Sequence, residues 1–495
     1  MSVFVLGVYG LCNTETVPFT SENHQYMTST TTTMQHQSHH LISSLANSPK
    51  FTFSDPDYNN DYDPEKCERD RFFDPWRVPT TKAAANLIED IIKQIDSYEV
   101  QYGMRGRARQ KRHSENHELA VSAIACDMLH YIFSGETNGA AISRSKRLNT
   151  VKSRYKPEFI GKTLPDILDT MAAGPLSIIR QEIGYEDWSA SRHQITKIYP
   201  GEGLFVLMDK HNIKPKDIRC RPQRECIVLK STKNGYWDNS VPIEYPDTDR
   251  THAYRAELQI INEWIAGGRI EYHPAQKENE TQVDLSDRYL RRIFTRNRFD
   301  SGGRLFGGFW QNLKRRYRKG IMIEGEPAWE MDYRQIAPRI LYSIAGAKPK
   351  QSDIYAIPQF AGHPSEKNYR EGFKKLLNTL LFIEKPISRK PKGTARTLPP
   401  GQCVTELADM LRDNHPDISP YFESGIGHHL QFLESEILID VMIKLMEKGI
   451  VALPLHDAVM VPKSRIPEAN TIMRNTFFHH TGLNIDLSIK EAGTE

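Results

Sequence analysis

The sequence predicts an α+β fold, in which short buried strands and longer helices alternate without an internal repeat. Two short apolar runs lead to acidic residues, Asp332 and Asp457, as strands reaching the edge of a sheet do. Apolar residues recur at helical spacing in 83–95, 117–133 and 428–447. With 495 residues, the chain is long enough for two or three domains that each bury a core.

Residues 1–79 are predicted to be a disordered, low-complexity segment. From about Asn13 to Tyr62 the chain is rich in Thr, Ser, His, Asn and Asp and shows no sustained hydrophobic period. Such a segment cannot bury enough apolar surface to offset its conformational entropy.

Residues 80–287 are predicted to form a mainly helical, thumb-like region that grips nucleic acid. Its order of helix, helix and hairpin with a Gly-rich tip at 200–203 is that of a winged helix. A small structural α+β subdomain is the alternative. The basic link 105–112 is a further candidate for nucleic-acid contact, with a solvated loop as the alternative. The strand-like stretches are Gln194–Tyr199, Leu204–Met208 and Glu225–Leu229.

Positive charge is concentrated in one part of a nearly neutral chain. Lys and Arg number 65 against 62 acids, a formal net charge of +3. Between residues 288 and 319, eleven basic residues face a single acid, Asp300, which predicts a phosphate-contacting surface. A solvated charged face is the alternative. The basic residues are Arg288, Arg291, Arg292, Arg296, Arg298, Arg304, Lys314, Arg315, Arg316, Arg318 and Lys319.

Composition argues against a disulfide scaffold and a membrane protein. The six cysteines are scattered, and only Cys220 and Cys226 are close, without histidines to complete a zinc site. The apolar start, Val3 to Cys12, lacks the basic flank and cleavage site of a signal peptide. No apolar run approaches the roughly 18 residues of a membrane span. We expect a cytoplasmic monomer with no membrane partner.

The first chemical motif surrounds Asp332. Residues 328–332 can form a buried strand, and Ile336, Ile340 and Leu341 have helical spacing, with Pro338 tolerable in the first turn. A carboxylate at such a strand-to-helix junction is well placed to bind a metal ion. A plain helix N-cap is the alternative.

The second motif is the hairpin around His456 and Asp457, which follows the predicted helix 428–447. A turn that simply favours Asp is the alternative. Two aspartates on separate strands would suffice for a two-metal centre, because Mg²⁺ prefers a few carboxylates together with water and phosphate oxygens.

The third motif places two cations, an amide and an aromatic ring on one helical stripe. Arg370, Lys374, Asn378 and Phe382 recur every four residues. Such a stripe can hold a triphosphate at one end and stack a base at the other. An amphipathic, solvated helix would explain the cations but not their order.

Taken in chain order, the segments around Asp332, Lys374 and Asp457 resemble motifs A, B and C of the family A DNA polymerases and of the related single-subunit phage-type RNA polymerases. Smaller matches lie at Gly303-Arg304-Leu305, at Gln311-Asn312-Leu313 and at Ser352-Asp353-Ile354-Tyr355. The resemblance covers about 288–495, which it implies to be a right-hand palm with helical fingers. The motif A match is Asp332-Tyr333-Arg334-Gln335-Ile336-Ala337-Pro338-Arg339.

The resemblance implies a role for each matching residue. Asp332 and Asp457, with the Tyr333 carbonyl, would bind two Mg²⁺ ions, for which Mn²⁺ can substitute. Arg370 and Lys374 would bind the triphosphate, and Lys374 would also protonate pyrophosphate. The remaining nucleotide-binding candidates are Phe382, Tyr333, Ala337 and Asn378. The candidates for contact with primer and template are Arg304, Gln311, Arg339, His456, Lys314 and Arg315.

Three departures leave the sugar preference open, one of which is Lys374-Lys375 with Thr379, a pattern that fits motif B of the RNA enzymes better. Ala337 stands where the DNA enzymes carry a Glu that blocks the sugar 2′ position, and Ala458 replaces an acid of motif C. We expect a DNA polymerase that uses a primed DNA template and nucleoside triphosphates and tolerates ribonucleotides. A DNA-directed RNA polymerase or primase is the first alternative, and a non-catalytic DNA-binding replication protein with a decayed palm is the second. A phage or mobile-element role is a further expectation.

Overall fold

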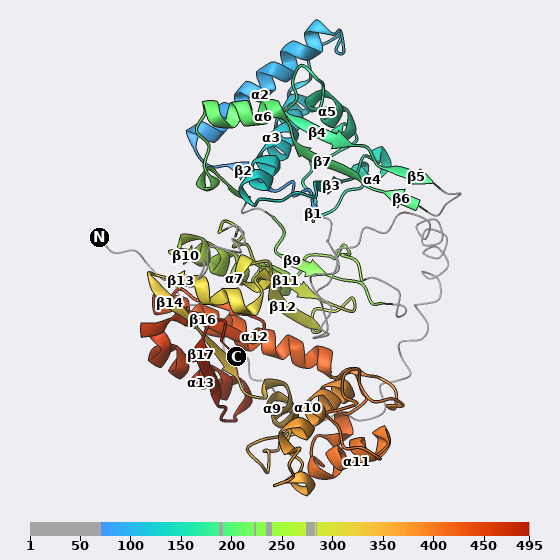
Figure 1. The fold of residues 1–495 in the computed structure, drawn as a ribbon, viewed down its shortest axis with the longest axis vertical. Helices are drawn as coiled ribbons and strands as arrows, with labels where there is room; N and C mark the ends of the chain where they lie inside the picture. Colours follow the sequence, from blue (N-terminus) through green and yellow to red (C-terminus); the bar gives the residue numbers. More distant parts are fainter. Residues whose placement is uncertain are drawn as a thin grey trace. The chain divides into compact units, whose positions relative to one another are not determined.

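The computed structural model describes residues 71–494, except 188–191, 222–223, 234–239, 274–282 and 284. Within these ranges the fold is mixed α+β, as expected, with several separate sheets (Figure 1). The helices seen there all lack the combination of length and apolar character that crossing a lipid bilayer requires. The predicted disorder of residues 1–70 lies outside the described residues.

A first hydrophobic core is built from residues between Ala84 and Ile218. Its four-stranded sheet has the order β1-β3-β7-β4, and β2 pairs with β8. The elements of this part are β1 (Arg71–Phe72), β2 (Arg77–Pro79), α2 (Lys82–Gln101), α3 (Lys111–Phe133), β3 (Ala140–Ile142), α4 (Lys146–Thr150), α5 (Leu164–Met171), β4 (Ile179–Glu182), β5 (Tyr185–Asp187), β6 (Arg192–Gln194), β7 (Thr196–Pro200), α6 (Glu202–Lys210), η1 (Pro215–Asp217) and β8 (Ile218–Cys220).

The two long helices of this core form where the apolar spacing predicts them. The Thr81 side chain caps α2 by accepting a hydrogen bond from the Ala84 N–H. Leu87, Ile91 and Ile95 then bury one stripe of the helix in the core.

Three expectations for this part were wrong. Residues 71–79 form β1 and β2 instead of continuing a disordered segment, because Trp76 is buried and Arg71 pairs with Asp127 of α3. Residues 204–208 form helix α6, not a strand. Only Leu204 and Leu207 of that run are buried, which is helical spacing. The Gly-rich stretch 200–203 therefore starts a helix, and the hairpin of a winged helix is not formed there.

A second, larger core extends from Cys226 to Ala492. Its main sheet has the order β10-β13-β14-β16-β15, with β17 paired to β14, and β12-β11-β9 form a smaller sheet. Its elements are β9 (Ile227–Leu229), α7 (Asp249–Gly267), β10 (Ile270–Tyr272), β11 (Arg291–Phe294), β12 (Gly302–Phe306), α8 (Phe309–Asn312), η3 (Arg315–Gly320), β13 (Ile321–Ile323), β14 (Glu326–Tyr333), α9 (Ile336–Ile344), η4 (Pro358–Phe360), α10 (Glu366–Phe382), α11 (Val404–Asn414), η5 (Ser419–Tyr421), α12 (Gly427–Glu447), β15 (Leu453–Leu455), β16 (Ala458–Pro462), η6 (Lys463–Arg465), α13 (Ile466–Thr481) and β17 (Leu487–Glu491).

The two cores divide between Ile218 and Cys226, not at the boundary inferred at 287/288. Helix α7 precedes the inferred boundary at 287/288, yet Leu258, Ile261 and Ile265 bury its apolar face in the second core. Residues 226–272 therefore share a core with 288–494.

Candidate active site

The register of the main sheet brings the two predicted aspartates together. In the antiparallel pair of β14 and β16, Asp332 lies directly opposite Ala458, the residue after Asp457. The turn that carries Asp457 requires His456 to adopt a left-handed backbone, with φ 60°. Asp332 is the last but one residue of β14, and Gln335, which also has a left-handed backbone, leads the chain into α9. Both acids thus lie at one end of the sheet.

The hairpin is held by side chains of α8. The Trp310 indole donates a hydrogen bond to the Pro454 carbonyl at 2.8 Å, and the Gln311 amide donates to the same oxygen at 3.1 Å. Gln311 also donates to the Leu305 carbonyl at 3.0 Å and accepts from the Gly307 N–H at 2.9 Å. The structure therefore places Gln311, a predicted primer-template contact, as an internal support of the Asp457 hairpin.

Asp332 lies in an environment that disfavours an isolated negative charge. Burial, followed by the charges of Asp457 and Glu330, raises its pKa to about 7, although the charges of Lys490 and Lys374 act in the opposite direction. Its Oδ1 atom is buried and has no hydrogen-bond partner among the described residues. A carboxylate oxygen that the fold leaves unpaired, beside a second carboxylate, fits a bound cation.

The donor set at this point is small. Within the described ranges, no three carboxylate, imidazole or thiol groups converge as one metal site. The side chain of Tyr333 is buried and its hydroxyl donates to the Met473 carbonyl at 2.8 Å, so only its backbone carbonyl is a candidate ligand. Two aspartates with water and phosphate oxygens would complete a magnesium sphere, as Mg²⁺ prefers.

Helix α10 carries the predicted stripe of Arg370, Lys374, Asn378 and Phe382. Lys374 is exposed, its Nζ lies 6.0 Å from the centre of the Tyr355 ring, and its charge acts on Asp332. Asn378 is half-buried. Lys374 is the member of the stripe most directly available to a bound anion.

Arg370 is engaged within the protein. Its Nε and Nη2 donate to the Asp353 carboxylate at 2.5 and 3.1 Å, and Nη1 donates to Glu371 at 2.8 Å. Asp353 is itself fixed by the Gln335 amide at 2.7 Å and by the Tyr355 N–H at 3.1 Å. These hydrogen bonds use three of the five N–H donors of Arg370 and balance its charge, so it attracts a phosphate less strongly than Lys374 does.

Phe382 lies at the end of α10 against the start of α12. Its ring meets that of His428 edge-on, with centroids 5.1 Å apart. A Cβ atom on Gly427 would approach the Phe382 ring to 2.8 Å, so the glycine is required for this packing. The aromatic ring is half-buried and keeps part of its surface for a ligand.

Many basic residues of the stretch 288–319 have partners within the fold, so only part of it is available as the predicted phosphate-contacting surface. Arg292 is fully buried, where it hydrogen-bonds Ser435 and pairs with Glu436. Arg304 is buried in an ion pair with Glu434, and this pair accounts for a side chain predicted to contact primer and template. Other guanidinium groups bind backbone carbonyls, as those of Arg288 and Arg318 do.

Apart from Arg298, which is exposed and pairs with Asp300, the exposed basic residues of that stretch lie at the turn that includes η3. Lys314, Arg315, Arg316 and Lys319 are exposed there. Arg315 donates to the Thr494 carbonyl at 2.8 Å, which leaves Lys314 as the freer of the two predicted nucleic-acid contacts. The predicted contact Arg339 donates to the Ser352 carbonyl at 2.8 Å, and Ala337 is half-buried on α9.

Sequence reasoning missed several charged residues around the aspartates. Glu330 shares a strand face with Asp332, and Lys490 lies opposite Glu330 on β17. Burial, followed by the charge of Asp457, raises the pKa of Glu434, although Arg304 lowers it. Only Glu330 carried a signal, because it stands two residues before Asp332 in a predicted strand. Lys490 and Glu434 are distant in sequence and could not be placed.

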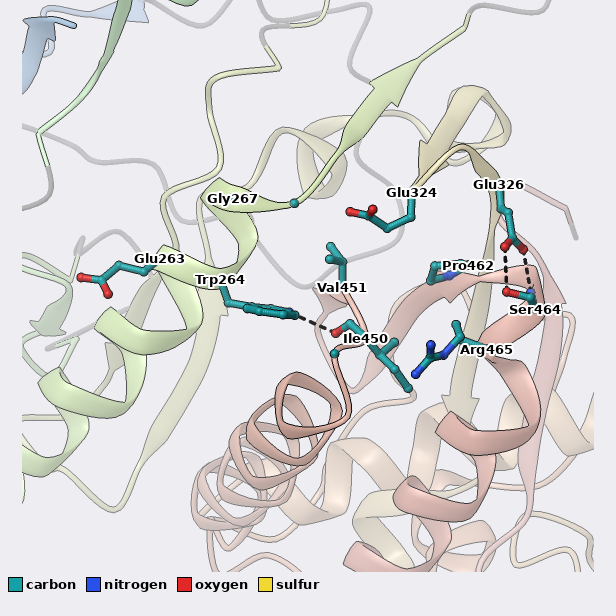
Figure 2. A pocket seen from close by; sticks show the side chains of 12 residues that line it. Glu263, Trp264, Gly267, Glu324, Glu326, Ile450, Val451, Pro462, Ser464 and Arg465 are labelled. Carbon is teal, nitrogen blue, oxygen red and sulfur yellow. Dashed lines mark hydrogen bonds between the residues drawn. The ribbon is translucent and has the colours of Figure 1, made fainter. Parts of the chain in front are cut away.

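A pocket of about 480 Å³ lies at the other end of β14. Glu326 lines this pocket (Figure 2). Along β14, Glu326 precedes Asp332 by six positions, a distance of roughly 20 Å. The polar groups of the pocket are used internally. Glu326 accepts hydrogen bonds from the Ser464 amide and hydroxyl, and Trp264 donates to the Ile450 carbonyl. A second pocket of about 410 Å³ adjoins Arg370 and Asp353.

Comparisons with known proteins add little to this geometry. No protein-family model matches the chain, and no curated protein does. Among solved structures, the chain is similar to the POL domain of Pol1 from M. smegmatis in complex with DNA primer-template and dNTP. The identity is 11%, the match covers 84% of this chain and 67% of that one, and the TM-score is 0.31. A similarity of this size carries no argument about function, which has to be made from the residues of the site.

Proposed function

We propose that the chain is a template-directed nucleotidyltransferase that extends a 3′-hydroxyl with nucleoside triphosphates, as a DNA polymerase does. The observation that carries the proposal is the pairing of Asp332 and Asp457 at one sheet end, where Asp332 keeps a buried, unpaired carboxylate oxygen. The Lys374 ammonium on α10 supplies the positive charge that a triphosphate needs, and its field reaches Asp332.

In the reaction, the 3′-oxygen attacks the α-phosphorus, the bond from that phosphorus to the bridging oxygen breaks, and pyrophosphate leaves. When bound, two Mg²⁺ ions would activate the hydroxyl and offset the charge of the leaving group. Asp332 and Asp457 would hold them, with the Tyr333 carbonyl. Lys374 would neutralise the triphosphate and give a proton to pyrophosphate. The half-buried ring of Phe382 would stack on the incoming base with the part of its surface that stays exposed.

Primer extension with the full chain tests this function. Asp332→Asn or Asp457→Asn should reduce Mg²⁺-dependent extension by at least a thousandfold while binding of primer-template changes little. Asp486→Asn is the matched control, because this exposed acid pairs with Arg474 on the surface. Extension that survives both substitutions would favour a contaminating activity or a non-catalytic DNA-binding protein.

Ala337 supports the alternative of an RNA polymerase or primase. A methyl group at this half-buried position on α9 leaves room for a 2′-hydroxyl. Incorporation of dNTPs and rNTPs on one template, with and without a primer, separates the two activities. Use of rNTPs alone, without a primer, would replace the DNA polymerase by the alternative.

A further inference from the structure

Glu330 is a buried carboxylate on the same face of the sheet as Asp332. Alternate residues of a strand point to one side, so Glu330 and Asp332 are neighbours about 7 Å apart along β14. Directly opposite residues of an antiparallel pair also share a face. The partners of Asp332 on that face are Ala458 and Ser488, and those of Glu330 are Met460 and Lys490.

An ordinary ion pair does not account for Glu330. Lys490 Nζ lies 3.7 Å from Oε1, longer than a hydrogen bond, and the lysine keeps about a quarter of its side chain exposed. The other oxygen, Oε2, is buried and unpaired as far as the described residues show. A cross-strand pair stabilises a sheet only slightly, whereas an unsatisfied buried charged group destabilises it by more than such a pair contributes. The strand therefore retains a carboxylate that its visible partner does not balance.

The position of this carboxylate relative to the aspartates supplies a reason. Asp332 Oδ1 and Glu330 Oε2 are both buried, both unpaired, and both on one face of one strand. Of the two cross-strand neighbours of Asp332, Ala458 offers only a methyl group and Ser488 only a neutral hydroxyl. Glu330 is thus the acid that the sheet places nearest to Asp332 on this face, apart from Asp457 at the turn.

We infer that Glu330 is a positioning residue of the metal centre, where it accepts a hydrogen bond from water bound to a divalent cation held by Asp332 and Asp457. The inference rests on the proposed function. Glu330 acts through water because no three acidic groups in the described ranges converge as direct ligands. The negative charge of Glu330 also holds the Lys490 ammonium beside the centre, because the two residues lie directly opposite each other in the pair of β14 and β17.

Binding of Mn²⁺ to the full chain without nucleotide, followed by the electron paramagnetic resonance of free Mn²⁺, tests the inference. Glu330→Gln keeps the shape and removes the charge, and it should weaken binding by about tenfold, as loss of an outer partner of a metal site does. Glu326→Gln is the matched control, because Glu326 lies on the same face of β14 but about 20 Å from Asp332. This variant should bind Mn²⁺ as the unaltered chain does.

Exchange of the acid between strands gives a second arm. Ala458→Glu in the Glu330→Gln background puts a carboxylate opposite Asp332 and should restore most of the lost affinity. If this variant does not fold, judged by its circular dichroism and melting temperature, Glu330→Asp replaces it. This substitution keeps the charge but moves it one methylene farther away. The Mn²⁺ affinity of Glu330→Asp should therefore fall between that of the unaltered chain and that of Glu330→Gln.

The results separate the inference from the proposed function. A purely structural Glu330–Lys490 pair predicts that Glu330→Gln and Lys490→Met lower the melting temperature equally and leave Mn²⁺ affinity within twofold, and that outcome overturns the inference. If Asp332→Asn and Asp457→Asn also leave Mn²⁺ binding unchanged, the metal centre itself is wrong. Loss of binding in the aspartate variants alone removes only the role of Glu330.

Discussion

Gln311→Ala distinguishes a structural support from a nucleic-acid contact. The Gln311 amide makes three hydrogen bonds of 2.9 to 3.1 Å, to the Leu305 and Pro454 carbonyls and from the Gly307 N–H. Each is worth about 0.5–1.5 kcal/mol, and the Pro454 oxygen keeps a second donor in Trp310. The substitution should therefore destabilise the hairpin by about 2 kcal/mol, or roughly thirtyfold in its opening equilibrium.

Hydrogen exchange of the amides in 453–462 measures that opening directly, and it is preferable to global unfolding because a chain with two cores need not unfold in one step. Faster exchange should accompany weaker Mn²⁺ binding, since Asp457 lies in the same hairpin, while affinity for primer-template stays within twofold. Asn312→Ala, at the exposed next residue, is the control. Unchanged exchange together with a large loss of DNA affinity would show that the structural reasoning is wrong.

Three other substitutions test separate parts of the fold and site. Arg304→Met leaves Glu434 buried and unpaired and should cost about 3–5 kcal/mol in denaturant unfolding, most of it recovered when Glu434→Leu is added; a loss of DNA affinity without destabilisation would contradict this. Burial, then Arg109, lowers the pKa of His117 to about 4, so this residue is neutral when folded. Its contribution to stability is complete above its unfolded pKa near 6.5 and is lost as pH falls from there towards 4, by up to about 3 kcal/mol. His117→Gln should flatten that part of the stability profile, and an unaltered profile counts against it. Ala337→Glu should lower the ratio of rNTP to dNTP incorporation at least tenfold, and an equal ratio would sink the steric argument.

The aspartate pair was predictable because the signal for each residue is local. An apolar run that ends in an acid places that acid at a strand end, and Asp332 and Asp457 satisfied this pattern. The register of β14 and β16 then converts two separate strand ends into one site. The stripe on α10 was equally local, since a four-residue spacing fixes the face of a helix.

Partners that are distant in sequence could not be predicted. Arg304 meets Glu434 across 130 residues, and Gln311 meets Pro454 across 143. The sequence predicted a nucleic-acid contact for each side chain and gave no sign of these partners in the core. Local composition also misled at 204–208, where five successive apolar residues fit a strand as well as a helix. In the structure this run belongs to α6, with Leu204 and Leu207 buried, and the helix follows Gly201, which lies so close to the Ser177 carbonyl that a Cβ atom would not fit.

The two cations of α10 are not equivalent in this structure, which bears on how a triphosphate would be bound. Arg370 faces two carboxylates, those of Asp353 and Glu371, so its charge is already more than neutralised. Lys374 is exposed, and its charge lowers the pKa of Asp332. A triphosphate would therefore meet Lys374 first. Arg370 could follow by exchanging a carboxylate for a phosphate oxygen, because both are charge-assisted acceptors of similar strength and the exchange costs little. Since Asp353 is also fixed by Gln335, the residue that joins β14 to α9, this exchange would link nucleotide binding at α10 to the segment that follows Asp332.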